Sequence, residues 1–280
     1  PLSNNATIFS VPGYGKENKL PRGFSIDRFA QLVEDCSMKK YMTVPTAHGF
    51  CMYIKREVID KIGILDEVGF ERGYGEENDF CYRAGQIGYH DVMCDDTFIY
   101  HSGTSSFLSN EKAAYIQKHV ELIKERHGIQ FNVTDLYCAH DPNWEVHENI
   151  ELQIELEREE RINILYMLQS DFKEGATDSV GGVQLHVKDL VEVLKFKNNI
   201  IVVARDGEFL NVTVYINEKC YPYQIYIGKA ANFPEIRSRK FFDIYKMILK
   251  TFRIQQIHVH HTLGLSLEIF YAAKDLGIPI

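Results

Sequence analysis

The sequence lacks any hydrophobic run long enough to cross a bilayer. No apolar stretch in its 280 residues approaches the roughly 20 residues that a membrane-spanning helix needs, so we expect no transmembrane segment. The first residues contain neither an initiator methionine nor the basic and then apolar pattern of a signal peptide. This start predicts a chain that is cut at its N-terminus.

Motifs for several common cofactors are also missing. The six cysteines form no C-x-x-C pair, which excludes zinc ribbons and thioredoxin-like proteins, and their scatter is typical of buried thiols in a reducing compartment. Neither a P-loop nor a G-x-G-x-x-G fingerprint is present, so ATP and NAD sites are poorly supported. A sugar-nucleotide epimerase or dehydrogenase would need the same dinucleotide fingerprint, so it is poorly supported as well.

Basic residues are too few for a protein that binds duplex nucleic acid. The chain has 31 lysines and arginines against 39 acids, a net charge of −8, so we expect no nucleic-acid partner. Residues 145–160 contain seven of the acids and one arginine, which gives this segment −6 and leaves −2 for the remainder. We expect residues 131–160 to be an acidic, solvated, helical linker between two domains, residues 1–130 and 161–280.

The pattern of apolar residues predicts an α/β fold on both sides of the linker. Before it, after a loop over residues 1–24, we expect helices at 25–37, 56–62, 76–87 and 109–127, and short strands at 41–45, 50–54, 89–94 and 97–101. The helix over 109–127 should end at Gly128, because glycine is a common helix stop.

After the linker, strands and helices alternate more regularly. We expect strands at 163–168, 199–204 and 256–260, a hairpin at 211–227, and helices at 183–194, 236–252 and 263–276. This alternation predicts βαβ units and a parallel sheet. An apolar strand is expected to begin at Pro279-Ile280, which predicts that the chain is truncated at its C-terminus as well.

Three carboxylates lie within four positions at the start of the helix over 76–87, at Glu76, Glu77 and Asp79. The helix dipole and free backbone N–H groups favour acids there, so one interpretation is purely structural. The other is that one carboxylate faces a cleft and removes a proton from a sugar hydroxyl, because like charges and partial burial raise its pKa. His101, which ends a strand, is either a structural histidine or a metal ligand.

The residues around these acids form a long ordered series. It runs through Gly49-Phe50-Cys51-Met52, Arg56-Glu57, Gly63-Ile64-Leu65-Asp66-Glu67, Gly73-Tyr74-Gly75-Glu76-Glu77-Asn78-Asp79, Arg83, Gly88-Tyr89 and Tyr100-His101. This series, over residues 1–130, resembles the C-terminal half of a family-2 glycosyltransferase of GT-A fold.

The resemblance implies roles for these residues. Glu77, flanked by Glu76 and Asp79, would deprotonate an acceptor hydroxyl for an inverting transfer. His101 would complete a site for a divalent metal, Mn²⁺ or Mg²⁺, that neutralises the diphosphate of a nucleotide-sugar donor. The substrate would lie against Gly49 and Gly75. The family more often has Asp at the position of Glu77, and its nucleotide-binding half, with a D-x-D motif, would lie upstream of Pro1.

A glycine pair follows the first strand after the linker, and histidines end its last full strand. Gly181-Gly182 precedes a helix, where backbone N–H groups favour a phosphate, although glycine pairs are also common in tight turns. His260 and His261 lie at the end of the strand over 256–260. Ligands of parallel sheets bind beyond the carboxyl ends of the strands, where both features fall.

These residues belong to a second ordered series. It consists of Asn163-Ile164-Leu165-Tyr166, Gly181-Gly182-Val183-Gln184-Leu185-His186-Val187, Leu190-Val191, His258-Val259-His260-His261 and Leu276-Gly277-Ile278-Pro279. The series resembles the start of a family-4 glycosyltransferase of GT-B fold. That implies a partial Rossmann-like domain over residues 161–280 and a retaining transfer. Gly181 and Gly182 would lie near the donor diphosphate and acceptor, and His260 or His261 near the acceptor pocket. The donor-binding domain, with its E-x7-E pair, would follow Ile280.

The two resemblances together imply a glycosyltransferase fragment that is inactive alone. It would transfer a sugar from a nucleotide-sugar donor to a saccharide or lipid-linked saccharide acceptor during bacterial surface polysaccharide assembly. This implies a cytoplasmic location, with at most peripheral attachment to a membrane. The alternative is a carbohydrate- or nucleotide-binding module without chemistry, in which Glu76, Glu77 and Asp79 only cap a helix.

Overall fold

A computed structural model describes residues 1–71, 73–103, 109–158, 160–172, 181–229 and 236–280. It contains helices throughout and a five-stranded mixed sheet, which confirms the α/β class. The chain divides into two compact units, Pro1–Leu152 and Gln153–Ile280. Within the described ranges, no helix combines the length and the apolar character that crossing a membrane requires.

The first unit is mostly helical. Its helices are α1 (Ile26–Cys36), α2 (Arg56–Ile62), α3 (Glu67–Phe70), α4 (Glu76–Gln86), α5 (Ser109–His140) and α6 (Trp144–Leu156), with a 3-10 turn η1 (Thr7–Phe9). The strand β1 (Leu2–Ser3) pairs in parallel with β4 (Phe98–Ile99), and β2 (Thr43–Val44) pairs antiparallel with β3 (Asp91–Val92). The segment 1–24, predicted as a loop, therefore contains β1 and η1. The strand predicted over 50–54 is absent, because no described strand pairs with this apolar segment.

Helix α4, which carries the acid cluster, is fixed from two sides. On one side Phe80 and Ala84 pack with Val58 of α2. On the other side Tyr82 packs with Phe70 of α3 and Ile123 of α5. Buried apolar contacts of this kind are the main source of helix stability in a globular protein. The start of α4 is therefore held in place by three neighbouring helices.

The segment α5 consists of two helices that meet at a kink. The kink lies at His127, whose φ of −139° and ψ of 41° are not helical. The helix predicted over 109–127 therefore ends where it was expected to end, although Gly128 does not adopt the positive φ of a glycine helix stop. The second helix, which runs on to His140, was not predicted. It is anchored to α4 by a 2.7 Å hydrogen bond between the hydroxyls of Tyr82 and Thr134.

The acidic segment is not a solvated linker. Residues 131–160 hold the end of α5 and the whole of α6, and α6 buries Val146, Ile150, Leu152 and Leu156. Helix α6 is therefore amphipathic, with its acids on the outer face and an apolar face inside. The boundary between the compact units falls within this helix, at Leu152 and Gln153.

The second unit is built on the five-stranded sheet, in the order β8-β7-β6-β5-β9. The strand β5 (Asn163–Ser170) lies between β6 (Asn199–Asp206) and β9 (Gln256–Val259), parallel to both. The strands β7 (Phe209–Ile216) and β8 (Lys219–Tyr226) form an antiparallel hairpin on β6. The predicted strands and hairpin are confirmed, but the hairpin joins the sheet and makes it mixed.

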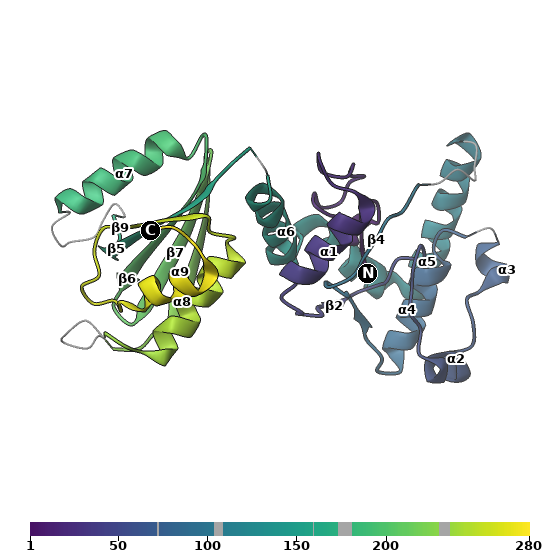
Figure 1. Cartoon of the computed structure of the whole chain (residues 1–280). Helices are drawn as coiled ribbons and strands as arrows, with labels where there is room; N and C mark the ends of the chain where they lie inside the picture. Colours follow the sequence, from purple (N-terminus) through teal and green to yellow (C-terminus); the bar gives the residue numbers. More distant parts are fainter. Residues whose placement is uncertain (72, 104–108, 159, 173–180, 230–235) are drawn as a thin grey trace. The chain divides into compact units, whose positions relative to one another are not determined.

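Helices cover both faces of this sheet. Figure 1 shows α7 (Gly182–Leu194) on one face and α8 (Arg239–Thr251) and α9 (Glu268–Leu276) on the other. Side chains alternate along a strand, so Tyr166 and Leu168 of β5 face α7, where they pack with Val187 and Val191. The alternate residues Leu165 and Met167 are buried as well, and α8 and α9 cover the other face of the sheet. Burial on both faces explains the continuous apolar run of β5.

The order of the strands in the sheet reverses direction at β5. From β5 the chain passes through α7 to β6 on one side, whereas β9 lies on the other side. The connections leaving β5 and β9 therefore diverge. A crevice at the carboxyl ends of such strands is the usual ligand site of an open α/β sheet.

Candidate functional site

Glu77 lies in the first turn of α4 and packs against a glycine from a distant loop. Its Oε2 accepts a 3.1 Å hydrogen bond from the N–H of Gly75, the residue before the helix. A Cβ placed on Gly49 would lie 3.5 Å from the Glu77 carboxyl carbon. The structure therefore brings together Glu77, Gly75 and Gly49, three of the residues predicted from the sequence.

Gly75 has a conformational reason to be glycine. Its φ is +124°, and a Cβ there would lie 2.7 Å from a methyl group of Ile123 and 3.1 Å from the ring of Phe70. An L-residue is strained at such a φ and has no room here. The turn before α4 thus directs Glu77 toward Gly49.

The rings of His48 and Phe50, the two neighbours of Gly49, lie next to the ring of His101. The rings of Phe50 and His101 are stacked with centroids 5.3 Å apart, and the His48 and His101 rings are 6.4 Å apart. The Glu77 carboxyl thus lies close to Gly49, and the His101 ring lies close to the rings on either side of that glycine. Burial, followed by the nearby His101, lowers the pKa of His48, which favours its neutral form.

His101 is oriented by the first residues of the chain. Its Nδ1 donates to the carbonyl oxygen of Asn5 at 2.6 Å, since a carbonyl can only accept. Its backbone N–H donates to the side chain of buried Asn4 at 2.7 Å. This arrangement leaves Nε2 of the neutral ring with the lone pair, so His101 offers one nitrogen ligand.

The described residues do not form a metal site by themselves. Among them, no group of three or more His, Cys, Asp or Glu side chains is arranged to hold a metal ion. His101 and His48 supply imidazole nitrogens, and no described carboxylate joins them. The Mn²⁺ or Mg²⁺ expected from the sequence prefers several oxygen ligands, and this set does not provide them.

Glu76 and Glu77 form a pair of interacting carboxyls. Burial raises the pKa of Glu76 above its usual value, and the charge of Glu77 and a hydrogen bond between the two carboxyls add to this effect. One buried oxygen of Glu76, Oε2, has no hydrogen-bond partner. A carboxyl in this position holds a proton more tightly than an exposed one.

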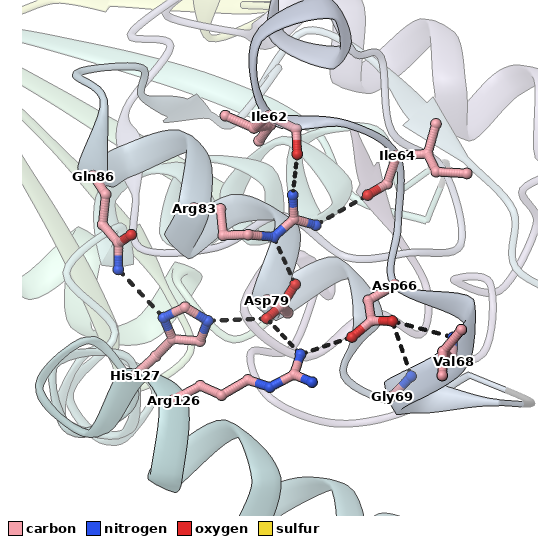
Figure 2. A network of polar contacts seen from close by, with 10 residues as sticks. All are labelled: Ile62, Ile64, Asp66, Val68, Gly69, Asp79, Arg83, Gln86, Arg126 and His127. Atoms are coloured by element: carbon pink, nitrogen blue, oxygen red, sulfur yellow. Dashed lines mark hydrogen bonds and ion pairs between the residues drawn. The ribbon is translucent and has the colours of Figure 1, made fainter.

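Asp79 lies in a network of cationic and histidine side chains, which Figure 2 shows. It is 2% exposed, and its carboxylate accepts from Arg83 at 2.8 Å, from His127 at 3.0 Å and from Arg126 at 3.3 Å. Burial acts to raise the pKa of Asp79, but these three donors together outweigh it, and the net shift is downward. Both oxygens of Asp79 are thus used within the protein, so it lies apart from the Glu77 site and holds α4 and α5 together.

The same network extends to two further segments of the first unit (Figure 2). Arg126 also pairs with Asp66 at 2.8 Å, and Asp66 accepts the N–H groups of Val68 and Gly69 at the start of α3. Arg83 donates to the carbonyls of Ile62 and Ile64. The acid of the G-x-x-D-E motif is therefore structural: it caps α3 and ties it to α5.

A cavity of about 490 Å³ lies beside the Glu77 site. His48 and Phe50 line it, while Gly49 between them lies close to Glu77. Its other lining side chains are largely apolar or aromatic, among them Met52, Ile54, Val58, Phe80 and Val92. Pockets of this size and character are typical of small-molecule sites.

In the second unit, the predicted glycine pair lies at the start of α7. Gly181 is the residue before the helix, and a Cβ there would lie 2.8 Å from the Gln184 side chain. No atom of the described residues would lie within 4 Å of a Cβ on Gly182, and its φ is not in the left-handed region. The described residues therefore give no reason for glycine at 182.

The histidines at the end of β9 form a small imidazole cluster. The backbone N–H groups of His260 and His261 donate to the Met167 carbonyl of β5 at 3.0 and 3.3 Å. The ring of His260 lies 5.8 Å from that of His186 on α7 and 6.4 Å from that of His258. Burial, followed by these two histidines, lowers the pKa of His260. His260 thus meets the helix that starts at Gly182, whereas the ring of His261 accepts from the N–H of Leu263 in the following loop.

Several residues of these sites were not predicted from the sequence. His48 lies between the strands expected at 41–45 and 50–54, Asn4 and Asn5 lie in the expected loop over 1–24, and His186 lies in the helix expected over 183–194. Their contacts depend on strand pairings and helix packing over long sequence distances, such as β1 with β4. The one local signal was His48 next to Gly49, in a segment that was already singled out.

Comparisons with protein-family models, with curated proteins and with solved structures find no match to this chain. The arguments for its function therefore come from its own residues and their geometry.

Proposed function

We propose that the chain is part of a glycosyltransferase that moves a sugar from a nucleotide-sugar donor to a saccharide or lipid-linked saccharide. The observation that carries this proposal is the position of Glu77, half-buried beside Gly49 and next to a second carboxyl. The ordered motif series of residues 49–101 supports the GT-A assignment of the first unit.

In this proposal Glu77 removes the proton of an acceptor hydroxyl. The hydroxyl oxygen then attacks the anomeric carbon from the face opposite the leaving group, and a carbon–oxygen bond forms. The bond between that carbon and the nucleotide diphosphate breaks, so the configuration is inverted. Burial, together with the charge of the neighbouring Glu77, raises the pKa of Glu76 and favours its protonated form.

The second unit fits the start of a GT-B module in the same proposal. The glycine pair and His260 lie beyond the carboxyl ends of β5 and β9, where the strand connections diverge. No described atom would lie within 4 Å of a Cβ on Gly182 in the first turn of α7, and the backbone N–H groups of a helix N-terminus favour a diphosphate. The Rossmann-like assignment and the retaining outcome rest on the motif series.

A divalent cation, Mn²⁺ or Mg²⁺, belongs to the proposal as a partner of the donor diphosphate. Of the described residues, His101 would bind this cation, and they do not provide a complete set of ligands for it. A role in bacterial surface polysaccharide assembly at the cytoplasmic side of a membrane rests on the resemblance.

A carbohydrate- or nucleotide-binding module without chemistry is the second candidate. The Asp79 network favours it in part, because this acid of the cluster has a structural role. It would bind a saccharide or a nucleotide and form no product with any donor.

The decisive test is sugar transfer by the protein that contains this chain. Transfer of labelled sugar from a panel of nucleotide sugars is measured for the wild type and for Glu77→Gln. We expect Glu77→Gln to lose transfer by about 10²-fold or more, because the amide cannot accept the hydroxyl proton.

A matched control is Glu57→Gln, which changes an exposed acid in the first turn of α2. It should leave transfer unchanged. Transfer at the wild-type rate by Glu77→Gln would refute the proposed base. Saccharide binding by the wild type with no product from any donor would support the binding module instead.

A further inference from the structure

The cavity beside Glu77 has few groups that could bind a sugar. Apart from tyrosines and cysteines, its polar lining side chains are His48, Lys55, His90 and Asp91. Burial raises the pKa of Asp91, which is half-buried, so its charged form is disfavoured. A saccharide needs hydrogen bonds to most of its hydroxyls, because each buried hydroxyl left unpaired weakens binding. The lining therefore favours an apolar occupant.

The apolar part of the lining is continuous with the core of the first unit. Val58, Phe80 and Ala84 line the cavity and also form the cluster between α2 and α4. Met52 and Ile54 pack against that cluster and line the cavity as well. A hydrocarbon chain in this cavity would bury apolar surface on both sides, which is the main driving force for such binding.

The cavity carries a cation at an exposed position. Lys55 is exposed, and no carboxylate of the described residues forms an ion pair with it. By contrast, Lys61 nearby donates to the hydroxyl of Tyr89 at 2.6 Å. An ammonium without a carboxylate partner is suited to a phosphate group. An apolar interior with a cation in its lining matches an amphiphile whose chain carries a phosphate.

The cavity also adjoins the proposed base. His48 and Phe50 belong to its lining, and Gly49 between them lies close to the Glu77 side chain, which is 3.5 Å from where a Cβ on Gly49 would be. A molecule whose chain occupies the cavity can therefore present its polar end near Glu77. We infer that this cavity binds the hydrocarbon chain of a lipid-linked acceptor and that Lys55 binds its phosphate. The assignment to an acceptor rests on the proposed function, but chain binding itself does not require transfer.

The experiment is a binding titration of the chain followed by backbone amide NMR. The probes are octyl phosphate and octyl β-D-glucoside, kept below their critical micelle concentrations. Inorganic phosphate and methyl β-D-glucoside are the controls that lack the chain. We expect saturable shifts of the cavity residues with both octyl compounds and binding at least about tenfold weaker with the two controls.

Two matched variants test the site. Met52→Glu places a charge in the cavity and should lower the affinity for both octyl compounds by about tenfold. Met38→Glu changes an exposed methionine elsewhere and should leave both affinities unchanged. Lys55→Gln should lower the affinity for octyl phosphate by about threefold and leave the affinity for octyl glucoside unchanged. Should Met52→Glu fail to fold, Val92→Lys replaces it, because Val92 lines the cavity and is 47% exposed.

The absence of saturable shifts with both octyl compounds would overturn the inference, and so would equal affinity in Met52→Glu and Met38→Glu. Equal binding of methyl and octyl glucoside would show a sugar site in place of a chain site. Because these titrations measure binding alone, the loss of transfer in Glu77→Gln does not affect them. A failed titration likewise leaves the test of Glu77 intact.

Discussion

His127 Nε2 lies 3.0 Å from Asp79 Oδ1, although the two residues are 48 positions apart in the chain. The contact joins the middle of α5 to the first turn of α4 at the point where α5 is distorted. The same carboxylate also accepts from Arg83 and Arg126 (Figure 2). One buried carboxylate thus holds the helix that carries Glu77.

Asp79→Asn should destabilise the first unit by about 2 kcal/mol, because it removes the buried anion that accepts hydrogen bonds from Arg83, Arg126 and His127. Urea unfolding followed by fluorescence measures this, since the single tryptophan, Trp144, lies in this unit. Asp60→Asn is the matched control: Asp60 pairs with Arg56 on the exposed surface of α2, and its loss should cost less than about 1 kcal/mol. Similar losses in both variants would contradict the role of Asp79.

The contribution of Asp79 should depend on pH in a defined direction. Its pKa is lower in the folded protein than in the unfolded chain, so the unfolded state binds the proton first. The stabilisation is complete above the ordinary carboxyl pKa of about 4 and is lost as the pH falls from there through the folded pKa. The difference in unfolding free energy between wild type and Asp79→Asn should therefore shrink below about pH 4.

Glu76→Gln should have the opposite effect. The folded pKa of Glu76 is raised, mainly by burial, so its ionisation costs stability as the pH rises above the unfolded value. At pH 7 we expect Glu76→Gln to stabilise the first unit by about 0.5 kcal/mol or more, and near pH 4 this gain should vanish. Unfolding curves at both pH values test this. A gain of the same size at both would mean that it does not come from the charge of Glu76.

Glycine substitutions should separate a structural glycine from one that leaves room for a ligand. Gly75→Ala should cost about 2 kcal/mol, because φ is +124° and a Cβ would collide with Ile123. Gly182→Val should keep the fold, since no described atom would lie within 4 Å of a Cβ at 182, yet abolish transfer by the second module while the first stays active. Thermal unfolding and both transfer activities are measured in parallel. Loss of both activities together would indicate misfolding.

The sequence by itself determined the elements of the second unit. Its strands alternate with amphipathic helices at short spacing, and such local patterns are decided by neighbours within one or two turns. It also identified Gly49, Gly75 and Glu77, which the structure brings together at one place. Each of these residues belongs to a short motif that is marked by glycines or by closely spaced acids.

Only the tertiary structure decided how the acid cluster is divided. Glu76, Glu77 and Asp79 look alike in the sequence, but Arg126 and His127 reach Asp79 from α5, 47 and 48 positions further along the chain. Likewise, the acidic stretch after residue 145 forms a helix whose apolar residues are buried. The net charge of the segment does not reveal this packing. Burial and long-range partners set the pKa of each carboxyl, and both depend on packing between segments far apart in the chain.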